Sequence, residues 1–466
     1  PDNQLVWAIN LGGAADDNAY SLLYAGDKLY LAGSFRKEIS FNNGSIQLNG
    51  KGLTDVFLAQ LAPDGSLAWA KAITSHAPAQ KAFLHAGHAG NIYLAGSFSK
   101  PVECAGIQIS QGDQKGIYYA SFSPSGNLEK SGYFNGLANI SLNGFLLTQN
   151  GNLCFAGSFT ESLQIDGQSL LSHGKTDGFI ACLDGEGKAL WLKNPGGAFD
   201  DEIKCLGQDS QGNLYTAGDF KYSFHAGREF TAPQNTDVFL IKYTPEGEMA
   251  WAVQLGEKSQ SYNTVTSIEV AADGRFFLSG AFRGKLQDSP MVKSLGNSKN
   301  AFIARFNTHG KRDWVLGTES SNENRLWMKL HPNSGGLFVS GYFSEGFKLG
   351  DFELKNKNYK DIFFGKLVDC DLGPKVKLGP DTTVCQGIEI QAKGNFTSYL
   401  WSNNQNTQTI KPGISCRYHV QATDKHGCIS FDTVMIQLLP APEFDLGEDK
   451  AICEGQNQLV EAPQGF

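Results

Sequence analysis

Charge is scarce in this chain, and basic charge never clusters. Only 18% of the 466 residues are Asp, Glu, Lys or Arg, and the formal net charge is −8. Lys and Arg form no run or stripe, which excludes the electrostatic footprint of a nucleic-acid-binding protein and a polybasic membrane patch. No apolar stretch approaches the roughly 18 residues that a membrane-spanning helix needs. Glycine (54 residues) and aromatics (11%) are abundant instead, which is typical of turn-rich β-structure.

The sequence also lacks the common motifs of catalysis and metal binding. It contains no G-x-S-x-G elbow, H-E-x-x-H pair, P-loop or EF-hand loop. His85 and His88 lie three residues apart in an expected strand, so their side chains should point to opposite faces and not chelate one metal. We therefore expect no cofactor, and a protein without enzymatic activity is favoured over an enzyme.

One short phrase recurs six times at an almost constant interval. Every copy ends in Gly-x-Phe, and the spacings between the glycines are 63, 61, 61, 62 and 61 residues. The six glycines are Gly33, Gly96, Gly157, Gly218, Gly280 and Gly341. A period of this size, with apolar runs and Gly-rich turns inside it, indicates an array of all-β units. Residues that recur in every copy should be structural, and function should lie where the copies differ.

Each repeat contains four strand signals. In the first repeat they cover residues 19–25, 28–34, 55–61 and 67–73, and about 20 irregular residues separate the second from the third. Four strands per unit, repeated radially, predict a β-propeller. A Trp recurs in the fourth strand, as in Trp191, Trp251 and Trp314, and we expect it to pack between neighbouring units rather than bind a sugar.

The two ends of the array predict how the ring closes. The segment around Trp7 is a fourth strand with no unit before it, and the last repeat stops after its third strand at 361–367. We predict that the N-terminal strand completes the last blade, which gives six blades and hides open sheet edges. The chain begins at Pro1 without Met or signal peptide and ends inside a motif, so we expect both ends to be trimmed.

The repeat resembles the SBBP-type β-propeller repeats of bacterial secreted and surface proteins. A typical unit of that family contains GNIYVTGSF, then D-x-F-x-A-K-L, then G-x-L-x-W-A. This chain has IYLAGSF at 92–98, DVFLAQL at 55–61 and LAWAKAI at 67–73. The resemblance covers residues 7–367; it is specific for the fold and says almost nothing about activity.

The period breaks after residue 375. Short strand signals, a mid-domain Trp401 and a late Tyr418 suggest an immunoglobulin-like sandwich. The order resembles the PKD/Ig-like modules of large exported proteins of Bacteroidota, with LGPDTTVC, YLWS and GC in the family's order. Cys416 and Arg417 depart from the usual Gly and Thr beside the Tyr. We predict a propeller over 1–369, an Ig-like domain over 370–440 and the start of a second, truncated module over 441–466.

The chain has nine cysteines. Cys385 and Cys428 hold the two family positions of the Ig-like module, so the resemblance implies a disulfide between them, which would place that domain outside the cytoplasm. Cys453 matches Cys385 in the second copy, and a pairing of Cys370 with Cys416 is left open. We expect Cys154, Cys182 and Cys205 to be buried, apolar thiols in propeller strands.

One constellation of acids is a candidate binding site. The links between units at 12–18 and 196–202 carry Asp16, Asp17, Asp200, Asp201 and Glu202. These links lie three units apart, so in a six-membered ring the two sets should face each other, with a cation or a basic partner between them. A turn-forming role for the same acids is the favoured alternative, and the identity of any metal is left open.

The placement of the loops predicts a binding face. One face of the propeller should carry short hairpins, and the other should carry long, divergent loops such as 36–54, 221–236 and 283–299. Loops of that length are usually functional or disordered, so we predict that partners bind the long-loop face.

The favoured function is recognition or adhesion at the cell surface or after secretion, by a propeller head on an Ig-like stalk that binds a protein or glycan partner. The alternatives are an accessory subunit of a gliding or outer-membrane secretion machine, and a glycan-active hydrolase or lyase. A pair of carboxylates in the central pocket would favour the enzyme. The family resemblance implies export by the type IX secretion machinery; we expect no nucleic-acid partner and no membrane span.

Overall fold

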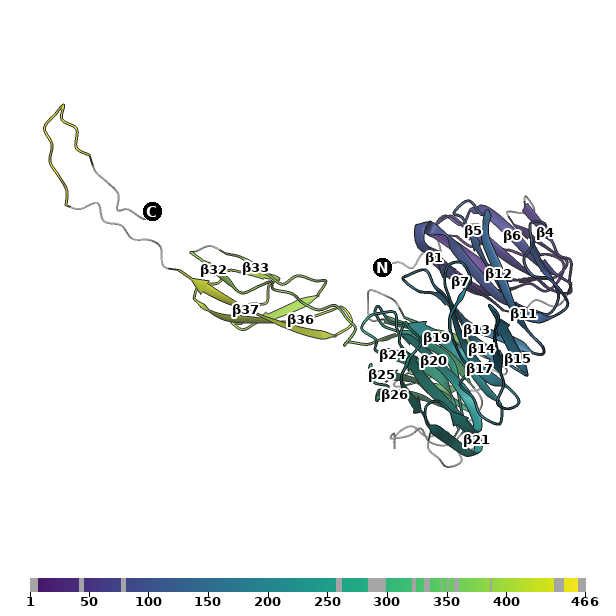
Figure 1. The fold of residues 1–466 in the computed structure, drawn as a ribbon. Helices are drawn as coiled ribbons and strands as arrows, with labels where there is room; N and C mark the ends of the chain where they lie inside the picture. The colour runs from purple at the N-terminus through teal and green to yellow at the C-terminus, as the bar shows by residue number, and fades with distance from the viewer. Residues whose placement is uncertain are drawn as a thin grey trace. The chain divides into compact units, whose positions relative to one another are not determined.

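The computed structural model describes residues 7–41, 46–76, 81–256, 262–283, 299–320, 324–330, 336–344, 346–349, 352–355, 360–385, 388–439 and 448–459. The protein is all-β, as the sequence predicts; the described residues form strands, turns and one 3-10 turn, η2 (His88–Gly90). None of their helices is long and apolar enough to cross a membrane. The chain divides into an N-terminal unit, Pro1–Leu330 with Phe338–Gly365, and a C-terminal unit, His331–Leu337 with Lys366–Phe466 (Figure 1).

Each repeat builds one antiparallel sheet whose strands follow the order of the chain. Five sheets contain four strands of their own repeat, and the sixth contains three among the described residues. Sheet 1 consists of β1 (Asn18–Ala25), β2 (Lys28–Phe35), β5 (Asp55–Leu61) and β6 (Leu67–Ser75), and sheet 2 of β7 (Ala82–Ala86), β8 (Ile92–Phe98), β11 (Lys115–Phe122) and β12 (Leu128–Gly136). Sheet 3 consists of β13 (Ile140–Leu147), β14 (Leu153–Phe159), β17 (Asp177–Leu183) and β18 (Ala189–Lys193), and sheet 4 of β19 (Asp201–Gln208), β20 (Leu214–His225), β21 (Glu229–Tyr243) and β22 (Met249–Gln254). Sheet 5 consists of β23 (Tyr262–Val270), β24 (Phe276–Arg283), β25 (Asn300–Phe306) and β26 (Arg312–Glu319), and sheet 6 of β27 (Arg325–Leu330), β28 (Gly336–Phe343) and β31 (Asp361–Val368).

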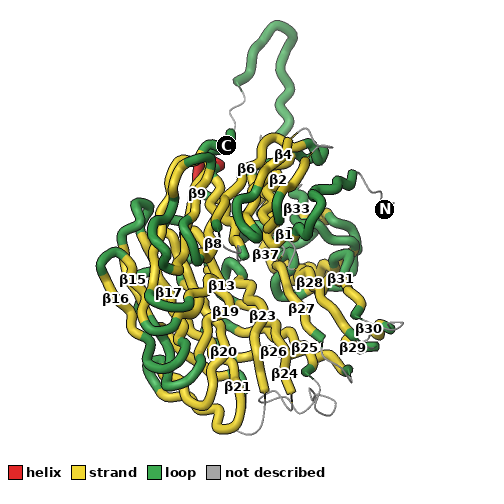
Figure 2. The backbone as a smooth tube through the Cα atoms, turned by 90° about the vertical axis from the view of Figure 1, so that its right-hand side faces the viewer, coloured by secondary structure: helices red, strands yellow, loops and turns green. Residues whose placement is uncertain are grey.

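The sheets of the N-terminal unit stack face to face around their first strands. β1, β7, β13, β19, β23 and β27 pack against one another in that order. Figure 2 shows β13, β19, β23 and β27 near the middle of this unit and β16 (Gln168–Leu171), β21 and β30 (Phe352–Leu354) at its rim. The middle strands have a neighbour on each face, so every residue of β5, β14 and β17 is buried, which explains their continuous apolar runs.

In five of the six repeats, the recurring glycine marks a close approach of two strands; the exception is Gly96, whose added Cβ would meet the Tyr118 side chain. A Cβ placed on Gly157 would lie 1.9 Å from the carbonyl oxygen of Ser141 on the first strand of its sheet. Gly218 and Gly280 face the carbonyl oxygens of Glu202 and Thr264 at 2.0 Å in the same way. Any side chain would push the first strand away, so the repeat requires glycine here.

The long loops are regular structure, contrary to the expectation of about 20 irregular residues. Segment 36–54 contains the hairpin of β3 (Glu38–Phe41) and β4 (Ile46–Asn49), and 221–236 lies inside the β20–β21 hairpin. Other repeats carry β9 (Val102–Cys104) with β10 (Ile107–Gln108), β15 (Ser162–Ile165) with β16, and β29 (Phe347–Leu349) with β30. Most of 283–299 lies outside the described residues.

These additional hairpins extend the sheet of the preceding repeat. β9 pairs with β6, β15 with β12, and β29 with β26. Each hairpin therefore covers the edge strand of its neighbour, which would otherwise present unpaired backbone groups to solvent. This role accounts for three of the long loops. The β3–β4 hairpin forms a two-stranded sheet of its own and 221–236 extends the β20–β21 hairpin, so partner binding by the long-loop face stays a prediction.

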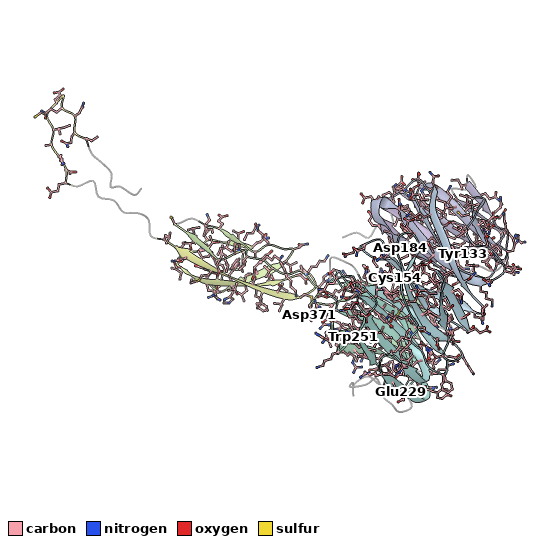
Figure 3. The ribbon with its side chains drawn as sticks, viewed as in Figure 1. Tyr133, Cys154, Asp184, Glu229, Trp251 and Asp371 are labelled. Atoms are coloured by element: carbon pink, nitrogen blue, oxygen red, sulfur yellow. A yellow bond between two sulfur atoms is a disulfide. The ribbon has the colours of Figure 1, made fainter. Side chains whose placement is uncertain are left out.

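The fourth-strand Trp joins successive sheets, which confirms its predicted packing role. The indole nitrogens of Trp69, Trp191 and Trp251 donate hydrogen bonds to carbonyl oxygens in the turn between the third and fourth strands of the next repeat, at 3.2, 3.0 and 3.0 Å. A glycine of that turn lies against each indole ring, and Figure 3 labels Trp251 on β22. Trp7 makes the same contact with sheet 1, where its Nε1 donates to the carbonyl of Pro63 at 2.7 Å.

The predicted pairing of the N-terminal strand with residues 361–367 is not found among the described residues. Residues 1–6 lie outside them, and the segment that follows is not a strand. In the described part of sheet 6, β31 has no fourth strand beside it, and its Ile362 and Phe364 are 88% and 73% exposed. The described N-terminal segment contacts the first repeat instead, through Trp7 at the turn of sheet 1 and through an isolated bridge from Gly12 to Ser40 of β3.

The C-terminal unit contains two small sheets around one core. The larger has the order β32 (Thr382–Val384), β37 (Ile429–Leu438), β36 (Cys416–Thr423) and β34 (Ser398–Trp401), and the smaller pairs β33 (Ile390–Gln391) with β35 (Thr409–Ile410). Trp401 and Tyr418 are buried between them, as expected for a sandwich, and donate hydrogen bonds to the carbonyls of Thr407 and Ile414. Residues 448–459, in the predicted second module, contain no strand.

The disulfide predicted between Cys385 and Cys428 is wrong. Cys428 is bonded to Cys370, while Cys385 is exposed and free. The strand β37 explains the difference: Cys428 precedes its first residue, whereas β32, which ends next to Cys385, pairs with its last residues. At about 3.4 Å per residue, the ten-residue strand separates the two cysteines by roughly 30 Å, far beyond the reach of a disulfide.

A second disulfide was not expected. Cys154 on β14 and Cys182 on β17 are directly opposite in the ladder of sheet 3, with their Cα atoms 4.2 Å apart, and are bonded (Figure 3 labels Cys154). Cys205 is a buried free thiol, as predicted.

Candidate functional site

The predicted acids of the inter-sheet links form matching turns in the two repeats. Oδ2 of Asp17 accepts a hydrogen bond from the amide of Gly13 at 2.8 Å, and Oδ2 of Asp201 accepts one from the amide of Gly197 at 2.6 Å. Their other oxygens accept from the amides of Arg36 and Lys221, at 3.3 and 3.4 Å. Both carboxylates thus satisfy turn amides, which is the turn-forming role that the sequence favours.

The neighbouring acids form ion pairs within their own repeats. Asp16 lies 3.7 Å from Arg36, and Asp200 lies 2.8 Å from Lys221. The Lys221 ammonium holds the pKa of Asp200 below its ordinary value. Glu202 lies beside Asp219 in the β19–β20 ladder. Among the described residues, no group of three or more His, Cys, Asp or Glu side chains is placed to hold a metal. The acids therefore act in local turns, and the expected cation between the two sets has no ligand group here.

Asp201 also forms a buried acid pair that sequence analysis did not separate from the turn. Asp201 and Asp177, the first residue of β17, are both 0% exposed. Burial, with further contributions from Asp177 and Asp200, raises the pKa of Asp201 to about 7. Burial also raises the pKa of Asp177, whose Oδ1 accepts no hydrogen bond from any described residue. Oδ2 of Asp177 accepts a hydrogen bond from the backbone amide of His173 at 2.6 Å and lies 2.9 Å from its Nδ1. The charge of Asp177 adds to the effect of burial on Asp201, so both favour the protonated form of Asp201.

The central cavity is the second candidate site. It has a volume of about 540 Å³ and lies at the ends of five first strands, β7, β13, β19, β23 and β27, where they lead into the short hairpins. Leu84, Phe145 and Ile268 form part of its wall. Its polar lining residues include His85, Thr148, Gln149, Gln208, Glu269 and Lys329. A concave site with apolar walls and a few polar groups is typical of ligand binding.

Glu269 and Lys329 give the cavity a fixed charge pair. Nζ of Lys329 lies 3.1 Å from Oε1 of Glu269, and Oε2 of Glu269 accepts a hydrogen bond from the amide of Leu330 at 3.2 Å. The carboxylate is 15% exposed, while the lysine side chain is 79% exposed. The carboxylate is therefore engaged by the protein, and the ammonium keeps donors for other groups.

His85 is an uncharged acceptor in this cavity. Its Nδ1 lies 2.9 Å from the carbonyl oxygen of Ala86. Burial lowers the pKa of His85; the Ala86 carbonyl opposes this effect, and the positive charge of Lys329 adds to it. The neutral imidazole places its proton on Nδ1, where it donates to Ala86, and its Nε2 remains an acceptor.

Sequence analysis singled out His85 only as a rejected metal ligand and missed Glu269 and Lys329. It also placed His88 in a strand, whereas β7 ends at Ala86 and His88 begins the 3-10 turn η2. A signal was available in the register. His85 and Glu269 pair with residues three before the repeat glycine, and the equivalent residues of sheets 3 and 4 are Leu146 and Gly207. At this position of the first strand, sheets 2 and 5 carry a polar residue, whereas sheets 3 and 4 do not.

The comparisons with known proteins do not assign a family. No family model and no curated protein matches the chain. One similar solved structure is a protein of unknown function from Dyadobacter fermentans, with 9% identity and a TM-score of 0.36 over 76% of this chain and 93% of that one. Puromycin hydrolase has 8% identity and a TM-score of 0.32, and the match covers 92% of this chain and 61% of the hydrolase. Rhamnogalacturonan lyase YesW has 10% identity and a TM-score of 0.33 over 91% of this chain and 90% of that one. Similarity this low assigns no activity.

Proposed function

We propose that the chain is an exported recognition protein that binds a partner through the central cavity of its N-terminal unit. The observation that carries this proposal is the cavity itself, which presents a charge pair, an imidazole acceptor and side-chain amides on apolar walls. Among its described lining residues, Glu269 is the one carboxylate, and Lys329 and the backbone already engage it. Hydrolysis of a glycoside usually requires two carboxylates facing the substrate, so this arrangement favours binding over that chemistry.

The proposal includes a finer description of the fold: the N-terminal unit is a six-bladed propeller closed by the N-terminal segment. Two contacts support it. Trp7 binds the turn of sheet 1 as Trp69 binds the turn of sheet 2. Gly12 bridges to β3 at Ser40, just as β6 pairs with β9 of the next repeat. Residues 7–12 thus have the contacts of a fourth strand that precedes sheet 1, and in a ring this strand would complete the described part of sheet 6.

Export is proposed from the cysteines together with the family resemblance. The two disulfides, Cys154–Cys182 and Cys370–Cys428, are stable in oxidising surroundings. The resemblance to SBBP-type repeats and PKD/Ig-like modules favours a head on a stalk at the cell surface, delivered by the type IX machinery.

The test is attachment of the purified chain to intact cells, measured by fluorescence. Gln149 lines the cavity at an exposed position, so Gln149→Trp should narrow the cavity and reduce attachment at least tenfold. The matched control is Gln211→Trp, in the equivalent hairpin of the next repeat and outside this cavity. Equal loss in both variants would contradict a role for the cavity. A glycan-cleaving activity that Glu269→Gln abolishes would overturn the non-enzymatic proposal.

A further inference from the structure

The polar and charged groups of the central cavity indicate which class of ligand it can bind. Its charged and polar groups differ in how far the protein already satisfies them. Glu269 uses one oxygen for Lys329 and the other for the Leu330 amide, so it offers little to a ligand. Lys329 is held at 3.1 Å from that carboxylate, and most of its side chain remains exposed. The pair is neutral overall, but the exposed ammonium keeps N–H donors while both carboxylate oxygens are occupied, so the cavity offers charged donors that suit an anionic group.

The geometry of Lys329 favours a compact anion. Glu269 fixes the ammonium in one place, so a second carboxylate can bind it without first ordering a free lysine side chain. Besides Lys329 and Glu269, His85 is the titratable group among the described lining residues, and it is uncharged when its pKa lies below the working pH. A single cation faces the ligand, which favours a monoanion over a polyanion.

The remaining polar groups match hydroxyls. Nε2 of His85 is free to accept a hydrogen bond, and the side-chain amide of Gln149 can donate and accept. The amide of Gln208 can do the same, with one donor already directed at the carbonyl oxygen of Gly212 at 3.4 Å. Such mixed donors and acceptors suit the hydroxyl groups of a sugar ring, whose C–H faces can lie on Leu84 and Ile268. A peptide chain end would also supply a carboxylate and backbone amides, so titration with a dipeptide separates the two ligand classes. About 540 Å³ is enough for one or two sugar residues.

We propose that the central cavity binds a sugar that carries a carboxylate, with Lys329 as the carboxylate-binding residue and His85, Gln149 and Gln208 as hydroxyl-binding residues. This inference rests on the proposed recognition function and names its ligand class. The ammonium of Lys329 binds the ligand's carboxylate, while Glu269 positions that ammonium. No covalent step is involved.

The experiment is calorimetric titration of the full chain with D-glucuronate, D-glucose and an acetylated dipeptide with a free carboxylate. We expect glucuronate to bind and glucose to bind at least tenfold more weakly. Lys329→Gln should weaken glucuronate binding at least tenfold and leave glucose binding unchanged. Lys130→Gln is the matched control, because Lys130 is also held by one glutamate, Glu186, at 2.7 Å, on a surface away from the cavity.

Three results would overturn the inference: glucose binding as tightly as glucuronate, the dipeptide binding more tightly than glucuronate, or equal effects of Lys329→Gln and Lys130→Gln. Its failure is distinguishable from failure of the recognition function. If Gln149→Trp abolishes attachment to cells while glucuronate does not bind, the cavity is a recognition site for another ligand. Circular dichroism of each variant should match that of the unmodified chain, so that a loss of binding reports on the site.

Discussion

At the residue scale, the buried Asp201 beside Asp177 has a counterpart elsewhere in the molecule. At the junction of sheets 4 and 5, Asp237 stands where Asp177 stands, and Asn263 stands where Asp201 stands. There the amide of Asn263 donates to Asp237 at 2.9 Å. At the junction of sheets 3 and 4, Asp201 replaces that asparagine, so the side-chain amide is replaced by a carboxyl group whose pKa is raised to about 7. The same two positions are thus occupied by an acid and an amide at one junction, and by two acids at the other.

The first prediction follows from this pair. The pKa of Asp201 is raised to about 7 in the folded chain, so the folded state keeps a proton that the unfolded chain loses near pH 4. Stability should therefore fall as the pH rises from about 4 to about 7, by up to about 4 kcal/mol, and then level off. Asp201→Asn should remove this slope and be the more stable form at pH 8. Urea unfolding at five pH values measures it.

The matched control for this prediction is Asp200→Asn. Lys221 lowers the pKa of Asp200, so the Asp200–Lys221 ion pair stabilises the folded chain above the pKa of Asp in the unfolded chain. Asp200→Asn should therefore slightly lower the free energy of unfolding at neutral pH. Identical pH slopes for Asp201→Asn and the unmodified chain would show that the pKa of Asp201 is not raised in the folded state.

At the element scale, each sheet is joined to the next by an indole and a turn glycine. A Cβ on Gly247 would lie 2.5 Å from Cδ2 of Trp191, and φ is +84° there. Gly247→Ala should therefore cost both the left-handed backbone conformation and an overpacked contact, about 2–4 kcal/mol together. Gly167 provides the control, because its φ is +75° and no atom lies within 4 Å of its added Cβ. Gly167→Ala should cost only about 1 kcal/mol, and equal losses in urea unfolding would disprove the indole contact.

The sequence predicts many of the contacts within and between the sheets, and the features that it does not predict have physical explanations. The repeat glycines and the fourth-strand Trp recur because backbone contacts demand them, so periodicity revealed them. The hairpins β9–β10 and β15–β16 escaped notice because they are short and their pairing partner belongs to another repeat. Cys385 was paired wrongly because family position says nothing about which end of β37 a cysteine reaches. The cavity residues His85, Glu269 and Lys329 become visible only once the strand register places them together.

At the scale of the N-terminal unit, ring closure can be tested by its register. In sheet 1, Lys71 is opposite Leu58. The same register in sheet 6 places Ile9 opposite Phe364, and both are exposed in this structure, at 41% and 73%. The double variant Ile9→Cys, Phe364→Cys should form a disulfide, detected by mass mapping of non-reduced peptides.

The control for closure is Ile9→Cys with Ile362→Cys, which is out of register by two residues and should not cross-link. Failure of the in-register pair, or equal yields from both pairs, would refute closure by the N-terminal segment. Closure should also bury Ile362 and Phe364, whose present exposure is unusual for a strand in a stack of sheets.

The hairpins that pair with the sheet of the preceding repeat affect the order in which the chain folds. As the chain is synthesised, the edge strand β6 has no partner until β9 has been made, because Ile73 pairs with Cys104, 31 residues later. At about 5–20 residues per second, that edge stays open for roughly 2–6 s. Joining residue 9 to residue 364 spans more than ten times as much chain, which adds about 2 kcal/mol of loop-closure entropy. Assembly should thus run from the first repeat to the last, with the ring joined at the end.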